Sequence, residues 1–146
     1  MLRSKAEVYL HLVWGTWRRE PLISDDMEQR LYACITREAE FLGCTVYAVN
    51  GMPDHVHIVV KLPTTVTIAK LAKQVKGSSS TLARNQLSLS GFFGWQDRYA
   101  AFSVSRWDLK KVLEYVRNQK AHHQNGSVIH QLEVTEEQVE GANGKG

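Results

Sequence analysis

The sequence predicts an α+β fold, in which a four-stranded antiparallel sheet and helices follow the order β-α-β-β-α-β and one more helix comes last. Three observations predict it. Short segments rich in β-branched and aromatic residues alternate in polarity, longer segments repeat apolar residues at helical spacing, and a turn signal separates two neighbouring strand segments. This order is that of the split βαβ, or ferredoxin-like (RRM-like), fold, with helices on one face and the first and third strands at the centre of the sheet.

The first half of the sequence predicts two strands, the helix between them and the start of a hairpin. Residues 7–14, within EVYLHLVWGTW, predict the first strand. Ser24 is the expected N-cap of a helix that begins with acidic residues and ends at Gly43. The segment CTVYAVNG predicts the second strand, closed by a hairpin turn at Asn50-Gly51. The segment GMPDHVHIVVKLP then predicts a third strand, antiparallel to the second.

The second half predicts two more helices and a last strand. The segment TVTIAKLAKQVKGSSSTLARNQL predicts a helix with a threonine cap, which the run GSSS at residues 77–80 could break or bend. A short strand over AFSVS and a long closing helix over RWDLKKVLEYVRNQKAHH follow. From Gln124 the periodic pattern fades, so we expect one domain over residues 1–123 and a polar, flexible tail over residues 124–146.

The composition is that of an ordinary globular protein. The 146 residues are 43% hydrophobic and 23% charged, which fits one domain with a sizeable core. No run approaches the roughly 20 apolar residues that span a bilayer, and the N-terminus is a poor signal peptide, so we expect a cytoplasmic protein without membrane contacts. Cys34 and Cys44 lack a metal-binding spacing and are expected to stay reduced. All four tryptophans are expected in the core: Trp14, Trp17, Trp95 and Trp107.

Two histidines share one face of the predicted third strand. His55 and His57 are two positions apart, so in an extended chain both side chains point to the same face, while Val56 and Ile58 point to the other. Two imidazoles can bind one divalent cation if a third ligand comes from elsewhere in the chain. The plainer interpretation is that both histidines are half-buried polar residues hydrogen-bonded to their neighbours.

The closing helix carries two polar residues beside its apolar stripe. Tyr115 and Gln119 are one turn apart and are expected to point the same way. The amide oxygen of Gln119 could supply the third metal ligand, and the phenol of Tyr115 could attack a phosphate that the metal polarises. The resulting phosphotyrosine would conserve the energy of the broken phosphodiester, which suits cutting and rejoining. Taken alone, Tyr115 is more often a packing residue.

The segments MPDHVHIVV and VLEYVRNQKAHH together make the chain, over roughly residues 7–123, resemble the single-tyrosine HUH transposases. These are small enzymes of single-strand insertion sequences and their REP-associated relatives. HUH stands for histidine, a hydrophobic residue and histidine, here His55, Val56 and His57. The segments HLVWGTWRREPLI, KQVKGSSS and WQDRYAAFSVS resemble the family's first strand with its basic turn, its second helix and the entry to its fourth strand.

The resemblance implies a DNA transposase that cleaves and rejoins single-stranded DNA through a 5′-phosphotyrosine. It implies that Tyr115 is the nucleophile and that His55, His57 and Gln119 hold Mg²⁺ or Mn²⁺. It also implies a homodimer that recognises DNA hairpins. After His123, however, the sequence is polar and acidic where many relatives continue into another helical segment.

The formal net charge of +3 agrees with a polyanionic partner such as nucleic acid. If the resemblance holds, phosphate contacts are expected from the basic residues Arg18, Arg19, Lys70, Lys73, Lys76 and Arg84. Taken alone, the three lysines are equally well explained as the solvated face of a helix.

Three other functions fit the same residues. The first is an initiator of replication or mobilisation with the same chemistry, which the small size and the lack of a second domain argue against. The second is a non-catalytic, domesticated nucleic-acid-binding module on the same fold, although HVHIVVKL lacks the aromatic residues on which an RNA-recognition domain stacks bases. The third is a small metalloenzyme unrelated to DNA.

Overall fold

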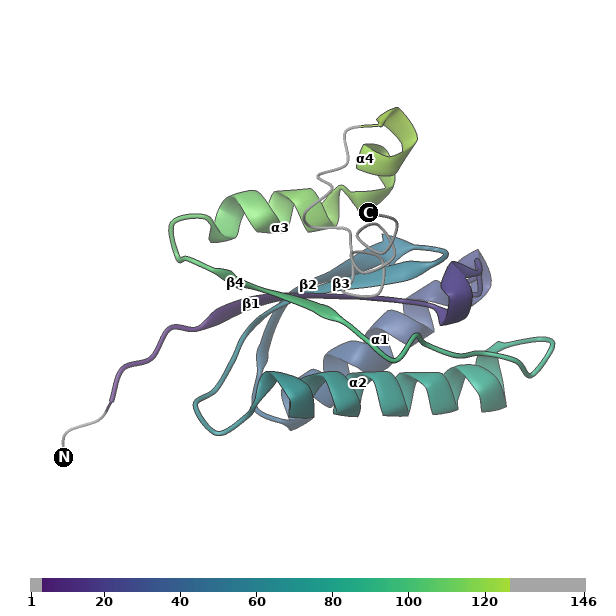
Figure 1. Ribbon diagram of the computed structural model, residues 1–146, viewed down its shortest axis with the longest axis horizontal. Coiled ribbons are helices and arrows are strands. Elements are labelled where there is room, and N and C mark those ends of the chain that lie inside the picture. The colour runs from purple at the N-terminus through teal and green to yellow at the C-terminus, as the bar shows by residue number, and fades with distance from the viewer. Residues whose placement is uncertain (1–3, 127–146) are drawn as a thin grey trace, which may run out of the picture.

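The computed structural model describes residues 4–126, which form one sheet with helices on both of its faces (Figure 1). In chain order the elements are β1 (Tyr9–Gly15), the single turn η1 (Trp17–Arg19), α1 (Asp25–Phe41), β2 (Thr45–Met52), β3 (His55–Lys61), α2 (Ile68–Leu82), the wide turn η2 (Ala83–Leu87), β4 (Ala100–Val104), α3 (Leu109–Arg117) and α4 (Gln119–Asn125). The predicted tail lies almost entirely outside the described residues.

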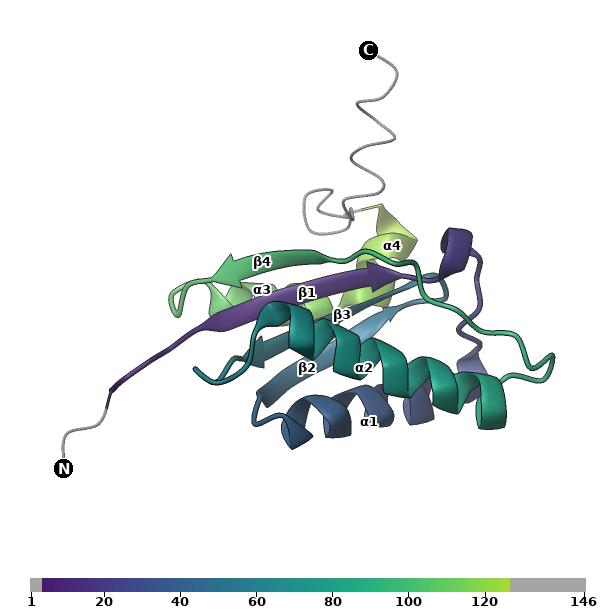
Figure 2. The same ribbon diagram turned by 60° about the horizontal axis from the view of Figure 1, so that its bottom comes forward.

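The four strands pair antiparallel in the order β2-β3-β1-β4, so β1 and β3 are central as predicted. Helices α1 and α2 lie side by side on one face of the sheet, and α3 and α4 lie on the other (Figure 2). The two crossover helices and the central strands confirm the ferredoxin-like arrangement. The last two helices are an addition to that arrangement and cover the second face of the sheet.

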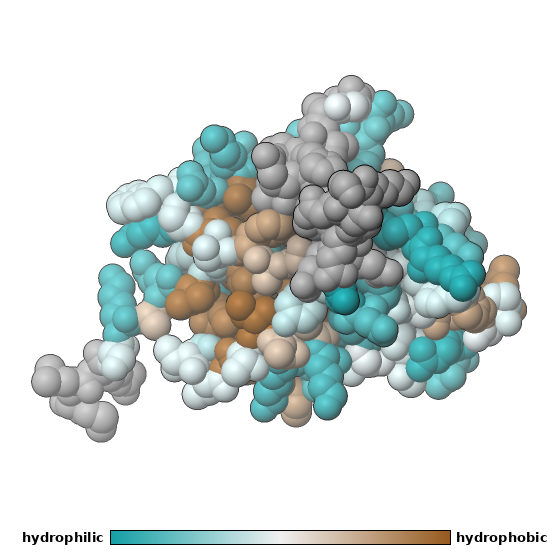
Figure 3. All heavy atoms as spheres, viewed as in Figure 1, coloured by the Kyte–Doolittle hydropathy of each residue, from teal (hydrophilic) through white to brown (hydrophobic). Residues whose placement is uncertain are grey.

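Alternation along the central strands divides their side chains between two clusters. The main core lies between the sheet and helices α1 and α2, and its largest members include Leu12, Trp14, Leu31, Ile35, Ile58 and Leu71. The second cluster is small and holds α3 against the opposite face through Val59, Tyr115 and Val116. In Figure 3, apolar residues gather over β4 and the side of α3 that faces it.

The hairpin turn lies three residues later than predicted. Asn50 and Gly51 belong to β2, and the two-residue turn between the strands is Pro53-Asp54. Position 51 requires a glycine although it is not part of the turn, because a Cβ there would collide with the backbone carbonyl of His55. The glycine therefore permits a close approach of β2 and β3 beside the histidines.

The predicted closing helix is two helices. At Asn118 the backbone has φ −100° and ψ 24°, which ends α3, and α4 begins at Gln119. The bend that GSSS suggested is also absent from α2, because the Ser79 and Thr81 hydroxyls donate to carbonyls one turn earlier and are accommodated within the helix. Thr67 caps α2 as predicted, its hydroxyl accepting a hydrogen bond from the backbone N–H of Lys70.

The prediction of four core tryptophans is wrong for two of them. Trp14 is buried and Trp95 packs against the core, but Trp17 is 38% exposed and Trp107 is 82% exposed. The two cysteines are free and buried, as expected. Within residues 4–126, no helix has the length and apolar character needed to cross a bilayer.

Candidate active site

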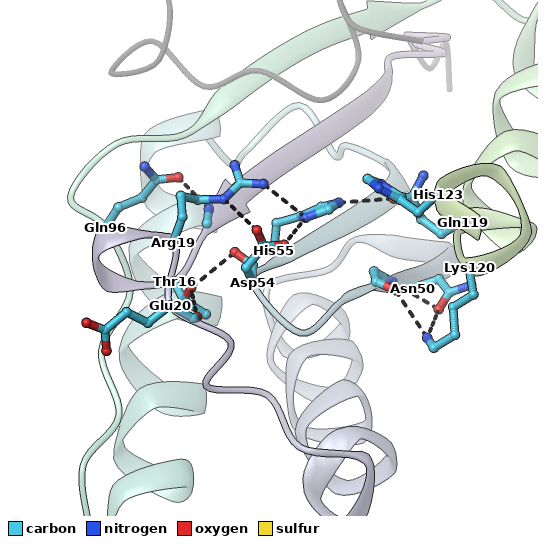
Figure 4. Close-up of polar contacts among 12 residues, drawn as sticks. Thr16, Arg19, Glu20, Asn50, Asp54, His55, Gln96, Gln119, Lys120 and His123 are labelled. Atoms are coloured by element: carbon cyan, nitrogen blue, oxygen red, sulfur yellow. Dashed lines mark hydrogen bonds and ion pairs between the residues drawn. The ribbon is translucent and has the colours of Figure 1, made fainter. Parts of the chain in front are cut away.

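The two histidines of β3 lie where the sequence predicted, on the face of the sheet that α3 and α4 cover. His55 and His57 are almost fully buried, with ring centroids 5.1 Å apart. Gln119 is also fully buried, and its Oε1 lies 3.0 Å from Nε2 of His55 (Figure 4). The structure therefore brings together the two imidazoles and the amide, although 62 residues separate His57 from Gln119 in the sequence.

A carboxylate orients the ring of His55 from behind. Oδ1 of Asp54 lies 2.7 Å from Nδ1 of His55, and the Arg19 side chain contacts both residues, at 3.3 Å from Oδ2 of Asp54 and 3.1 Å from Nδ1 of His55 (Figure 4). Burial raises the pKa of Asp54, but the hydrogen bond to His55 and the charge of Arg19 outweigh it and lower that pKa to about 2. The ionised carboxylate can accept a proton from Nδ1 of His55, and Nε2 of the same ring faces Oε1 of Gln119.

His57 is oriented by a histidine that the sequence analysis did not single out. Nε2 of His11, in β1, lies 2.8 Å from Nδ1 of His57, and the two rings stack with centroids 5.0 Å apart. His11 is fully buried. It is a diagonal cross-strand neighbour, because His57 pairs directly with Val13. Finding it from the sequence would have required the register between two strands.

Helices α3 and α4 contribute an aromatic cluster over the histidines. Tyr115 is 5% exposed, its ring stacks on that of His122 at 4.6 Å, and its centroid lies 6.3 Å from that of His57. Nε2 of His123 lies 2.9 Å from Oε1 of Gln119. Although the helix break at Asn118 separates Tyr115 from Gln119, both still face the histidines, as their spacing predicted.

Polar contacts hold α4 against β2 of the same chain. Asn50 Nδ2 donates to the backbone carbonyl of Arg117 at 3.0 Å. The Lys120 ammonium donates to Asn50 Oδ1 at 3.1 Å, to the Gly51 carbonyl at 3.1 Å and to Glu28 Oε1 at 2.7 Å. The Asn50-Gly51 pair, predicted as a turn, is thus an anchor for the helix that carries Gln119 (Figure 4).

The six basic residues predicted to contact phosphates do not form one patch. Arg19 alone contacts a predicted metal ligand, while Arg18 is exposed beside it. Lys70 and Lys73 are exposed on α2, on the opposite side of the sheet from the histidines. Lys76 is half-buried and donates to the Gln96 carbonyl at 2.7 Å. Burial lowers the pKa of Lys76, and the negative charge of Asp97 offsets part of this shift.

Arg84 completes this set and lies near the end of the α2–η2 helical run. Its guanidinium donates to the Phe93 carbonyl at 3.4 Å, in the long connection that leads to β4. Arg84 therefore contacts a loop and not the histidine pair. Of the six predicted basic residues, Arg18 and Arg19 are the ones adjacent in sequence and structure to the candidate site.

The donor set fits a divalent cation. Imidazole nitrogens suit transition metals such as Zn²⁺ and Fe²⁺, and a neutral amide oxygen is the kind of ligand that Mn²⁺ and Mg²⁺ prefer. Each of the two histidines has its Nδ1 engaged from behind, by Asp54 or by His11, as is typical of metal-binding imidazoles. Within the described residues no three His, Cys, Asp or Glu side chains are grouped to hold a metal, and the Gln119 amide is a further donor beside the histidine pair.

Comparison with known proteins agrees with this arrangement. The family model described as "Transposase IS200 like" matches residues 4–119, which include both histidines, Tyr115 and Gln119. The chain belongs to this family. The IS200-like transposases are the single-tyrosine HUH family that the sequence resembles, so that prediction is confirmed, and the protein is a transposase.

Individual relatives extend the likeness over most of the chain. The ISDra2 transposase TnpA of Deinococcus radiodurans is 25% identical over 127 residues, which cover 82% of this chain and 91% of the relative. A solved structure described as a transposase from Deinococcus radiodurans matches with a TM-score of 0.61 at 23% identity, covering 82% of this chain and 98% of its own.

A second solved structure is that of a REP-associated tyrosine transposase bound to a REP hairpin. It matches with a TM-score of 0.62 at 14% identity, covering 88% of this chain and 74% of the other. At such identities the likeness concerns the fold. It places the additional helices of this chain within an architecture that other transposases share.

Proposed function

We propose that this transposase cleaves and rejoins single-stranded DNA, with Tyr115 as the nucleophile and His55, His57 and Gln119 as ligands of Mn²⁺ or Mg²⁺. One observation carries the proposal: α3 and α4 bring a tyrosine and an amide onto the face of the sheet that bears the paired histidines. If His57 and Gln119 only filled space under the helices, apolar side chains would do so at a lower desolvation cost.

The chemistry assigned to each side chain follows from its surroundings. The Tyr115 oxygen attacks the scissile phosphorus, the bond from phosphorus to the 3′ oxygen breaks, and the DNA 5′ phosphate remains on the tyrosine. The departing strand end takes up a proton and becomes a 3′ hydroxyl. In the reverse direction a 3′ hydroxyl attacks the phosphotyrosine and the phenol is released. A bound divalent cation would supply polarisation of the phosphate and neutralise charge on the leaving oxygen.

Positioning accounts for the remaining residues. Asp54 and His11 hold the rings of His55 and His57 in fixed orientations, so the ligand nitrogens need no rearrangement. The ring of Tyr115 stacks on that of His122 and is 5% exposed, so we expect the side chains around it to shift when DNA reaches the phenol. Arg19 adds a positive charge behind His55, at the Nδ1 edge of the ring, where it also pairs with Asp54.

A covalent adduct tests the proposal. Wild-type protein is mixed with a labelled single strand that carries a hairpin, in the presence of Mn²⁺, and the products are separated in SDS. We expect a labelled protein band that Tyr115→Phe abolishes and Tyr9→Phe retains, because Tyr9 lies in β1 against Tyr47. No adduct with wild type, alongside intact DNA binding, would instead support the non-catalytic binding module.

The DNA form and the oligomeric state are parts of the same proposal. The hairpin-bound structural relative supports a hairpin-bearing strand as the substrate, and a matched strand with a scrambled stem is the control. We expect a homodimer in solution, as the family resemblance implies, and sedimentation equilibrium measures it. Within one chain the proposed nucleophile lies beside all three proposed ligands, and a dimer that exchanges the tyrosine-bearing helix between subunits would instead pair them across the interface.

A further inference from the structure

We propose that Trp17 and Phe92 form a stacking platform for one unpaired base of single-stranded DNA, beside the candidate active site. This inference rests on the proposed function for the identity of the strand. The two rings are the exposed aromatic pair that the core does not explain: Trp17 is 38% exposed and Phe92 is 47% exposed. Their centroids lie 5.5 Å apart at 76°, so they make an edge-to-face corner.

The platform is held in place from both sides. The backbone N–H of Trp17 donates to the Gly94 carbonyl at 2.9 Å, which ties η1 to the loop that carries Phe92. A Cβ at Gly94 would lie 3.4 Å from the Trp17 Cβ, an ordinary van der Waals contact, so Trp17 lies close against this loop. A bridge between Thr16 and Trp95 fastens the same loop to the end of β1. Rigid placement of this kind suits a recognition surface, since little side-chain freedom remains to be lost on binding.

The strained backbone next to Trp17 directs the side chains of two neighbouring arginines to different partners. Arg18 and Arg19 both have positive φ, at 53° and 55°, which is costly for residues with a side chain. The turn sends the guanidinium of Arg18 over the Trp17 ring, 4.4 Å from its centroid, and that of Arg19 to Asp54 and His55. Two neighbouring residues thus join the platform to the predicted metal ligand.

The chemistry of this surface matches a single strand of nucleic acid. An exposed aromatic ring offers stacking to any unpaired base, and an adjacent arginine offers a charge to the phosphate that follows it. A paired base is already stacked on its neighbours and cannot use such a corner. Because η1 adjoins the turn that carries Asp54, a base on the platform would lie in the strand that enters the site.

The same residue types elsewhere on the surface provide a matched control. Trp107 is 82% exposed, and the Arg106 guanidinium lies over its ring at 5.2 Å from the centroid. This pair lies in the connection from β4 to α3, at the opposite end of the sheet from η1 (Figure 1). Replacing Trp107 therefore shows the effect on DNA binding of losing any exposed tryptophan beside an arginine, and replacing Trp17 shows the effect of losing the platform.

Binding of a labelled single strand by fluorescence anisotropy tests the platform, in the Tyr115→Phe protein so that no covalent product forms. We expect Trp17→Leu to weaken binding about 5- to 150-fold, the range for losing one base stack, with the slope of affinity against salt unchanged. Phe92→Leu should weaken it less, and Arg18→Gln should reduce the salt slope by about one. Trp107→Leu should bind like the parent. Thermal unfolding of each variant controls for folding. If Trp17→Leu does not fold, the binding affinity of Phe92→Leu tests the platform in its place.

An abasic scan makes the result specific. A single abasic nucleotide is moved along the strand, and we expect one position at which it weakens binding to the parent protein but not to Trp17→Leu. Equal binding by Trp17→Leu and the parent, or an equal loss in Trp107→Leu, would overturn the platform. Its failure is distinct from failure of the proposed function, because adduct formation depends on Tyr115 and is measured separately.

Discussion

Replacing Asp54 with asparagine tests whether the orientation of His55 controls metal binding. The substitution keeps the shape of the side chain but removes the charge that faces His55 Nδ1 at 2.7 Å and Arg19 at 3.3 Å. A hydrogen bond to a charged group contributes about 1.5–3 kcal/mol, but the Asp54 side chain is 34% exposed and asparagine can still accept a neutral bond, so the lower part of that range applies. A loss of about 1.4 kcal/mol in the free energy of metal binding corresponds to a tenfold weaker site.

The assay is the Mn²⁺ dependence of the covalent adduct. We expect Asp54→Asn to raise the half-saturating Mn²⁺ concentration about tenfold while the yield at saturating Mn²⁺ stays close to that of wild type. Asp97→Asn is the control, because Asp97 is exposed and lies in the connection to β4. An unchanged half-saturating concentration in Asp54→Asn would refute the reasoning, as would a loss of yield that added Mn²⁺ does not restore.

Three further outcomes follow from contacts already described. His11→Ala leaves the buried Nδ1 of His57 without the partner it has at 2.8 Å, so we expect the free energy of unfolding, measured in urea, to fall by about 2–5 kcal/mol and Mn²⁺ binding, measured by calorimetry, to weaken. His122→Ala removes the ring stacked on Tyr115, and we expect adduct formation about two- to tenfold faster in single-turnover measurements. Below about pH 4, protonation of Asp54, whose pKa is lowered to about 2, removes its stabilising contribution, so unfolding between pH 4 and pH 2 should show a smaller fall in stability for Asp54→Asn than for wild type.

Local periodicity was enough to predict much of the fold and half of the site. His55 and His57 lie on one face because side chains in a strand alternate, and the apolar stripe of α3 indicates which side of that helix packs. Those features depend on residues close in sequence. The family resemblance then depended on the same local motifs, which is why it covered the proposed nucleophile and the proposed ligands together.

The parts that were missed depend on contacts between distant segments. His11 reaches His57 through the register of β1 against β3, which neither strand reveals alone. The turn was predicted at the wrong position because Gly51 permits a close approach of two strands. An Asn-Gly pair in the sequence does not distinguish this role of the glycine from a role in a turn. Trp17 was predicted in the core because tryptophan is hydrophobic, but the structure leaves it 38% exposed. Hydrophobicity describes transfer from water and does not say where in the fold a particular ring lies.

The attachment of α4 to β2 of its own chain has a consequence for mixtures of defective proteins. Lys120 donates to Asn50, Gly51 and Glu28 of the same polypeptide, and this arrangement sets Tyr115 against the histidines of its own chain. In a dimer assembled from chains in this arrangement, a copy lacking the phenol and a copy lacking an imidazole would not complement each other. Exchange of this helix between subunits would regenerate an intact centre from two inactive parents, so simple co-expression distinguishes the two assemblies.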